Sequence, residues 1–166
     1  MTRAPPEDPL VGDSRKLLSS GSKKTRKVIV VTKVLMLNPD ELHPHEDTDP
    51  ERVESMLAML RTTHEFHPPL LVDTTTRVVL DGHHRLEASK ILGCTRIPCY
   101  CVNYLENDSV TLQSWRPDDA ITKREVIDMG MGPDTFPLKT TRHIYKIPDS
   151  IGPVPLEDLL PDGASG

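Results

Sequence analysis

The sequence predicts one domain of the α+β class, in which short strands alternate with a few helices. Three observations predict it. Strand-like apolar runs recur at residues 70–72, 78–80 and 97–102, and turn residues separate them. A helical spacing of apolar side chains covers residues 53–60, and a second helical pattern begins after Gly82. At 166 residues, the chain is long enough for one compact domain with a hydrophobic core.

Composition divides the chain into a central domain and two tails. Residues 1–26 mix Pro, Ser, Gly, Lys and Arg without periodicity, so we expect a disordered N-terminal tail. Residues 27–148 contain the predicted elements, with a core in 34–104 and a C-terminal part in 105–148. The Pro- and Gly-rich residues 149–166 are expected to form a flexible C-terminal tail.

The first predicted elements lead to a well-marked helix. The β-rich residues 27–37 fit one long strand or two short ones. After a proline-containing loop, Asp49 is a candidate N-cap, and Thr48 with Glu51 matches a capping box. This helix is expected to end near residue 62.

The later elements are shorter. Gly93 is a plausible C-cap for the helix that follows Gly82, and residues 97–102 form the next strand. A strand is predicted at 110–115. The capping box Thr122-Lys123-Arg124-Glu125 then opens a short helix.

Composition also limits the function. The net charge of −5 argues against a protein that binds nucleic acid through charge alone. The cysteines Cys94, Cys99 and Cys101 are odd in number and match neither a disulfide framework nor a zinc spacing. Cys99 and Cys101 are expected in the core. The N-terminus lacks the apolar segment of a signal peptide or membrane span, so we expect a cytoplasmic protein without a membrane partner.

The clearest candidate site lies where the strand-like residues 78–80 meet the segment Asp81–Arg85, which reads Asp-Gly-His-His-Arg. A strand, a tight glycine turn and a helix start offer free backbone N–H groups to an anion. The two histidines and the arginine add cationic or hydrogen-bonding side chains. The segment therefore predicts a phosphate-handling site.

Three further groups stand out. Glu46 could orient or deprotonate a hydroxyl that accepts a phosphoryl group, or it could be a surface acid near a helix start. The segment 139–143, Lys-Thr-Thr-Arg-His, resembles an anion clamp. Trp115 is the only tryptophan, and a lone tryptophan is more often a core residue than a ligand platform. The basic residues 23–27 read as a solvated flank.

The run from Leu37 to Val102 resembles the ParB/sulfiredoxin-like domain superfamily. The loop acid, the helix and the segments 69–73, 80–85 and 92–98 carry the resemblance. Within the superfamily the chain is most similar to the free L-serine kinases, which form O-phosphoserine. They share the Asp-Gly-His-His-Arg motif and the Lys-Thr-Thr-Arg-His segment at 139–143. The resemblance implies a single domain with a small mixed β-sheet flanked by helices.

Relatives with other functions fit less well. Sulfiredoxins depend on a cysteine where this chain has His83. Partition proteins of the ParB type continue into a helix-turn-helix domain, and the proline-rich sequence after Tyr104 shows no such unit.

The resemblance implies a role for each matched residue. Glu46 would be the catalytic base, Asp81 would hold Mg²⁺ or the acceptor, and His84 would also be catalytic. Trp115 would border the serine site. The nucleotide phosphates would be bound by Gly82, His83, His84 and Arg85. The serine carboxylate and the transferred phosphate would be held by Lys139, Thr140, Thr141, Arg142 and His143.

The function implied is a Mg²⁺-dependent phosphotransferase that acts on free L-serine with ADP or ATP as donor, as a monomer or homodimer. Two alternatives stay open: a non-enzymatic nucleotide-binding regulator that contacts DNA or a partner through the basic N-terminal flank, and a nuclease. The sequence does not choose the donor. It also leaves serine, homoserine and threonine open as acceptors, because one methylene is worth only about 1–3 kcal/mol of discrimination.

Overall fold

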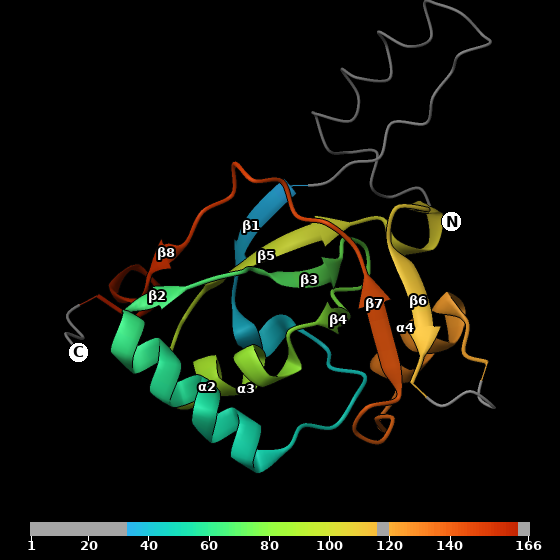
Figure 1. Cartoon of the computed structure of the whole chain (residues 1–166), viewed down its shortest axis with the longest axis horizontal. Coiled ribbons are helices and arrows are strands. Elements are labelled where there is room, and N and C mark those ends of the chain that lie inside the picture. Colours follow the sequence, from blue (N-terminus) through green and yellow to red (C-terminus); the bar gives the residue numbers. More distant parts are fainter. Residues whose placement is uncertain (1–32, 116–119, 163–166) are drawn as a thin grey trace, which may run out of the picture.

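The computed structural model describes residues 33–115 and 120–162, so the predicted N-terminal tail and residues 27–32 lie outside the described part. Within that part, three α-helices surround a small mixed sheet, as the α+β prediction requires. Figure 1 shows helices α2 (Pro50–Thr63) and α3 (His83–Leu92) together below the sheet, and a separate β6–β7 ribbon beside it.

The central sheet has the strand order β1-β5-β3-β4. These strands are Lys33–Leu37, Ile97–Val102, Leu70–Asp73 and Val79–Asp81. β5 and β3 are parallel, while β1 pairs with β5, and β4 with β3, in the antiparallel direction. The sheet is therefore mixed, and the predicted strands at 70–72, 78–80 and 97–102 are confirmed.

The two faces of the sheet are covered differently. Strands β3 and β5 are buried along their whole length, so their alternating side chains face two separate apolar clusters. Leu70 and Val72 of β3 pack with the apolar faces of α2 and α3. Leu71 packs on the other face with Tyr104 and Val126. Cys94, Cys99 and Cys101 are all buried, as the sequence predicted for the last two.

Local sequence explains the ends of both lower helices. Asp49 caps α2 by accepting from the Glu51 N–H at 3.0 Å. The predicted Thr48–Glu51 capping box does not form, because the helix begins one residue later than that box requires. Gly93 ends α3 with φ 83°, in the left-handed region that glycine occupies without strain.

The second half of the chain builds a smaller layer. β6 (Thr111–Ser114) pairs with β7 (Thr141–Ile144) in the antiparallel direction. Helix α4 (Lys123–Met131) starts with the predicted capping box at Thr122 and Glu125. The remaining elements are β2, β8 and three short 3-10 helices: Glu65–Phe66, Val154–Pro155, Pro39–Glu41 (η2), Tyr104–Glu106 (η3) and Leu156–Leu159 (η4).

The segment predicted to be a flexible C-terminal tail instead joins the core over part of its length. β8 pairs with β2 in the antiparallel direction. Leu156 is buried, and Leu159 is 0% exposed, in the cluster formed by α2 and α3. None of the helices in residues 33–115 and 120–162 has the length and apolar character needed to cross a membrane.

Helix α4 packs closely on the loop before β4, and this closeness predicts a stability effect. A Cβ atom at Gly130 would lie 2.6 and 2.8 Å from the two methyl carbons of the buried Val78. We expect Gly130→Ala to lower the free energy of unfolding by about 1–3 kcal/mol, the usual cost of overpacking. Urea unfolding measures it. Gly152→Ala is the control, because nothing lies within 4 Å of its added Cβ; equal stability of both variants would contradict the packing argument.

Candidate active site

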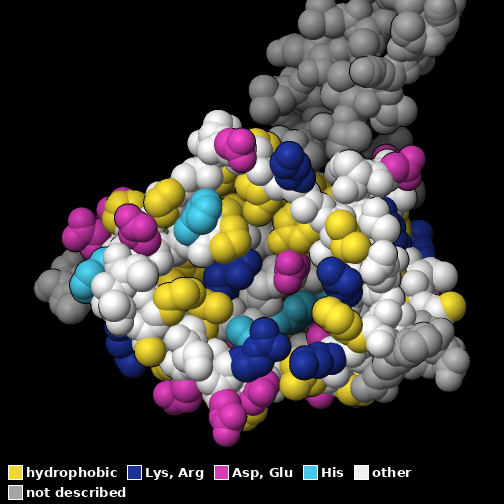
Figure 2. All heavy atoms as spheres, in the orientation of Figure 1, with side chains coloured by type: hydrophobic (Ala, Val, Ile, Leu, Met, Phe, Trp, Pro, Cys, Tyr) yellow, Lys and Arg dark blue, Asp and Glu magenta, His cyan; other side chains and the backbone are white. Residues whose placement is uncertain are grey.

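A pocket of about 320 Å³ opens where α2, α3, β4 and β7 meet. Figure 2 shows a hollow near the centre of this face, bordered by Lys and Arg side chains and with acidic and histidine side chains inside it. All the predicted site residues except Thr140 line the pocket: Glu46, Asp81, Gly82, His83, His84, Arg85, Trp115, Lys139, Thr141, Arg142 and His143. Segments separated by more than 90 residues therefore converge on one site.

Gly82 shapes one end of the pocket. It is the N-cap of α3 and has φ 104°, a left-handed conformation that side-chain-bearing residues rarely adopt. A Cβ there would also lie 2.5 Å from the Leu70 Cδ2 atom. The residue makes no side-chain cap, so the first N–H groups of α3 remain available to an anion. The predicted strand, glycine turn and helix start are present.

The two histidines of the motif are neutral rather than cationic. The Nε2 atom of His83 accepts a hydrogen bond from the His45 backbone N–H at 3.1 Å, and that of His84 accepts from the Asp49 N–H at 3.0 Å. A backbone N–H only donates, so each ring carries its proton on Nδ1. Burial is the largest effect that lowers the pKa of both rings. Repulsion between neighbouring rings, were they protonated, lowers the pKa of His83 further, and the charge of Arg52 lowers that of His84.

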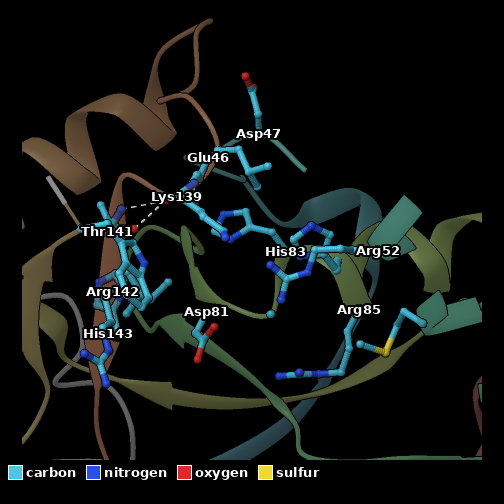
Figure 3. A pocket seen from close by; sticks show the side chains of 16 residues that line it. Glu46, Asp47, Arg52, Asp81, His83, Arg85, Lys139, Thr141, Arg142 and His143 are labelled. Atoms are coloured by element: carbon cyan, nitrogen blue, oxygen red, sulfur yellow. Dashed lines mark hydrogen bonds between the residues drawn. The ribbon is translucent and has the colours of Figure 1, made fainter. Parts of the chain in front are cut away.

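Positive charge at this end comes from arginines. Arg85 donates from Nη2 to the Pro69 carbonyl at 3.3 Å, while its buried Nε has no partner among the described residues. Arg52, in the first turn of α2, is exposed and lines the same side of the pocket. Figure 3 shows Arg52 and Arg85 on one side, Thr141 and Arg142 on the other, and Asp81 between them.

Glu46 lies on the opposite wall and is held by the chain around β7. Its Oε2 accepts from the Lys139 N–H at 2.9 Å. Its Oε1 accepts from the N–H of Thr141 at 3.0 Å and from the Thr141 hydroxyl at 2.7 Å. A bridge between Glu46 and Phe136 aligns the two segments. The carboxylate therefore has a fixed orientation at the pocket wall.

The wall formed by β7 carries the other cations. The guanidinium of Arg142 lies 5.0 Å from the centre of the Trp115 ring, a cation–π contact, and Trp115 is 52% exposed. The tryptophan is thus a rim residue rather than a core residue. Lys139 has φ 61°, and its backbone N–H faces Glu46. In the predicted clamp, residues 139 and 140 lie in a loop and residues 141 to 143 lie in β7.

Two residues of the segment from Lys139 to His143 use their side chains for hydrogen bonds within the domain. Thr140 is 3% exposed and its hydroxyl donates to the Pro137 carbonyl at 2.6 Å, so the structure does not bring its side chain into the pocket. His143 bonds to the Tyr104 hydroxyl, with 2.8 Å between Nε2 and the oxygen. Burial, with the nearby His45 and Lys123, lowers the pKa of His143 to about 3.

Sequence reasoning missed several lining residues. These are Asp47, Arg52, Met56, Leu80 and Leu138. Arg52 is the most informative of them, because it adds a cation from α2, outside both recognised motifs. The only sequence signal for Arg52 is its position in the first turn of the predicted helix. The bond between Asp49 and His84, which brings that turn to the motif, is visible only in the structure.

The residues present fit only a Mg²⁺ ion that arrives with a nucleotide. Within the described part of the chain, no group of three or more His, Cys, Asp or Glu side chains could hold a metal. Mg²⁺ at phosphate sites commonly takes one or two carboxylates, with phosphate oxygens and water as the other ligands. Asp81 is the carboxylate of the motif, and its Oδ2 also accepts from the Tyr145 hydroxyl at 2.7 Å.

These features define an α+β domain with a phosphate-compatible pocket at a strand–glycine–helix turn. The model of the ParB N-terminal domain matches residues 19–114, more than half of the chain, and the chain belongs to this family. The second wall of the pocket, from Lys139 to His143, lies outside the matched residues.

Curated relatives share part of this sequence. A "ParB-like protein" of Sulfolobus acidocaldarius is 35% identical over 89 residues, covering 51% of this chain and 44% of the relative. An "ATP-dependent L-serine kinase" of Staphylothermus marinus is 31% identical over 101 residues, covering 57% of this chain and 40% of the kinase. The chain thus spans less than half the length of these relatives.

Solved structures share the fold. A "free serine kinase in complex with AMP" has a TM-score of 0.67 at 16% identity, covering 81% of this chain and 98% of that chain. A conserved hypothetical protein from Pyrococcus furiosus has a TM-score of 0.66 at 18% identity, covering 81% and 98%. The likeness extends beyond the family match to most of the described domain.

The half-buried histidine of β7, His143, predicts a pH dependence of stability. An unfolded histidine binds a proton below about pH 6.5, whereas folded His143 stays neutral down to about pH 3. The unfolded state therefore binds more protons between these values, and stability falls as the pH is lowered through this range. We expect His143→Gln, which can still accept from Tyr104, to lose stability less steeply between pH 7 and pH 4.

Urea unfolding at several pH values measures this slope. His43→Gln is the matched control, because His43 is exposed, and it should keep the slope of the unmodified protein. A wild-type slope in His143→Gln would show that His143 does not stay neutral in the folded state.

Proposed function

We propose that this protein transfers a phosphoryl group from ADP or ATP to the hydroxyl of free L-serine, forming O-phospho-L-serine. One observation carries the proposal. The carboxylate of Glu46 is held in one orientation at a pocket whose two sides supply cations and N–H donors from separate parts of the chain. Such a pocket matches the needs of phosphoryl transfer, in which a carboxylate orients the acceptor and cations neutralise the phosphate.

The two sides of the pocket suit two substrates. On the α2–α3 side, Arg52, Arg85 and the N-terminus of α3 would bind the donor phosphates. His83 and His84 would add neutral Nδ1–H donors rather than charge. On the β7 side, Lys139 and Arg142 would hold the amino acid carboxylate and the transferred phosphate, with Trp115 at the rim.

Glu46 would act on the acceptor hydroxyl. The transferring phosphoryl group is loosely bonded in its transition state, so most of the catalysis comes from alignment and charge neutralisation. The orientation of Glu46 is fixed by its bonds to Lys139 and Thr141. A Mg²⁺ ion bound with the nucleotide would neutralise phosphate charge, and Asp81 would supply its carboxylate ligand from the protein.

The relatives support the acceptor and leave the donor open. The relative from Staphylothermus marinus carries an ATP-dependent name. An "ADP-dependent L-serine kinase" of Thermococcus kodakarensis is 25% identical over 115 residues, covering 65% of this chain and 47% of that kinase. Both nucleotides therefore belong in the test.

The test is an assay for O-phosphoserine with L-serine, Mg²⁺ and each nucleotide. We expect product with the wild type and a loss of about 10²- to 10⁴-fold in kcat for Glu46→Gln, the usual effect of removing a general base. Glu54→Gln, an exposed change on α2, is the control and should keep full activity.

In Glu46→Gln, the amide NH₂ group cannot accept a hydrogen bond, so one of the bonds that Glu46 makes is lost. Thermal unfolding is therefore measured on each variant to check that it is folded. A Glu46→Gln protein that binds nucleotide and keeps near wild-type turnover would refute the role of Glu46. If the folded wild type forms no O-phosphoserine with either nucleotide, the proposed function is refuted.

Arg52 gives a separate prediction for the donor side. We expect Arg52→Ala to raise the nucleotide Kd about 10- to 100-fold, because a hydrogen bond to a charged group is worth about 1.5–3 kcal/mol. Isothermal titration calorimetry measures the change. Arg61→Ala, in the last turn of the same helix and also exposed, is the control. Equal affinities of the two variants would place the nucleotide elsewhere.

A further inference from the structure

One buried titratable group beside the pocket has no part in the function proposed above. His45 is 0% exposed and lies directly before Glu46 in the chain. Its Nδ1 is 2.7 Å from the carbonyl oxygen of Val79, in β4. A carbonyl oxygen only accepts, so Nδ1 carries a proton.

The other ring nitrogen of His45 meets the same hydroxyl as Glu46 does. The Oγ1 of Thr141 is 2.9 Å from His45 Nε2 and 2.7 Å from Glu46 Oε1. A hydroxyl has one proton to donate. When the Thr141 hydroxyl donates to the Glu46 carboxylate, His45 Nε2 can pair with the hydroxyl oxygen only by donating a proton to it. When His45 is neutral, Nε2 is an acceptor, and the two groups compete for one proton.

The surroundings of His45 favour the neutral ring. Burial lowers its pKa below 6.5, and this outweighs the opposing effects of the Val79 carbonyl, Glu46 and Asp81. The other titratable rings that face it are His83 and His143, with ring centres 4.7 and 5.9 Å away. The neutral ring and the carboxylate thus share a single donor.

We infer that the Thr141 hydroxyl turns from Glu46 to His45 during the proposed phosphoryl transfer, which makes Thr141 and His45 positioning residues for the base. This inference rests on the proposed function. Before the reaction, the hydroxyl donates to the ionised carboxylate of Glu46, the stronger acceptor.

The step balances without moving a proton to His45. Glu46 takes the proton of the acceptor hydroxyl while the oxygen of that hydroxyl bonds to the phosphorus, and the bond from phosphorus to the leaving nucleotide oxygen breaks. The carboxyl is then neutral and a weaker acceptor, so the Thr141 hydroxyl turns to His45 Nε2. After product release, Glu46 gives its proton to water and the hydroxyl turns back.

The arrangement stabilises both protonation states of Glu46. The carboxylate keeps its backbone bonds from Lys139 and Thr141 throughout. The Thr141 hydroxyl changes its acceptor instead: it donates to Glu46 when that group is ionised and to His45 when it is protonated. Removing it should therefore lower kcat, with little effect on nucleotide binding, whereas a general loosening of the site would change both.

The test uses a matched pair of variants. Thr141→Val keeps the shape of the side chain and its place in β7 but removes the hydroxyl, and Thr141→Ser restores the hydroxyl. We expect kcat for O-phosphoserine formation to fall about 10- to 100-fold in Thr141→Val, the range of a charge-assisted hydrogen bond. Nucleotide Kd and thermal stability should stay near the wild type, and Thr141→Ser should recover most of kcat. Thr111→Val, an exposed change on β6, is the control.

A double-mutant cycle tests the link to His45. His45→Asn places an amide donor near the Val79 carbonyl and loses the contact with Thr141. If the two residues act through one hydrogen bond, the double variant should be little slower than Thr141→Val alone.

The possible failures are distinguishable. A folded wild type without kinase activity overturns the proposed function and, with it, this inference. An active wild type whose Thr141→Val variant keeps kcat within twofold overturns the inference alone. Additive effects of His45→Asn and Thr141→Val, or no recovery in Thr141→Ser, would also overturn it.

Discussion

The pocket depends on the attachment of Glu46 to the segment around β7. Its carboxylate accepts from two backbone N–H groups and one hydroxyl of Lys139 and Thr141. These bonds join the loop before α2 to a segment more than 90 residues later, and the backbone bridge to Phe136 runs beside them. A carboxylate held by several donors has little freedom to turn, so one set of contacts both closes the pocket and aims its acid. The attachment also joins the matched family domain to a wall that lies outside it.

Charge in the pocket is divided by residue type. A sequence with two histidines and an arginine after a glycine suggests three cations, yet each histidine accepts a backbone N–H and is neutral. Burial lowers the pKa of Arg85, but the ordinary pKa of a guanidinium is so high that the side chain remains charged. Positive charge around the pocket thus comes from Arg52, Arg85 and Arg142 and from Lys139, not from the histidines. The histidines position backbone: His83 holds the chain at His45, and His84 holds the start of α2.

Local patterns predicted what is locally determined. The glycine turn at Gly82, the strand before it, the helix after it and the capped helix at Thr122 follow from backbone preferences and apolar spacing, and the structure contains all of them. Contacts between residues far apart in the sequence could not be predicted from these patterns. Nothing in the sequence near Leu159 indicates that it packs against α2 and α3. Nothing near Thr140 and Thr141 indicates which of the two hydroxyls bonds to Glu46 and which to the Pro137 carbonyl. Arg52 was missed because its role depends on where α2 lies, not on its neighbours in sequence.

The position of Glu46, the proposed base, on the wall rather than on the Asp81–Arg85 motif would have a mechanistic consequence. The donor phosphates would bind to α3 and α2, which the central sheet supports rigidly through Leu86 and Val53. Glu46 is bonded instead to the chain segment that carries Lys139 and Arg142, where the acceptor would bind. Glu46 is also tied to the donor side, because the backbone N–H of the preceding His45 donates to His83 of α3. For a reaction governed by alignment, these bonds to both walls would hold the proposed base in place relative to donor and acceptor alike.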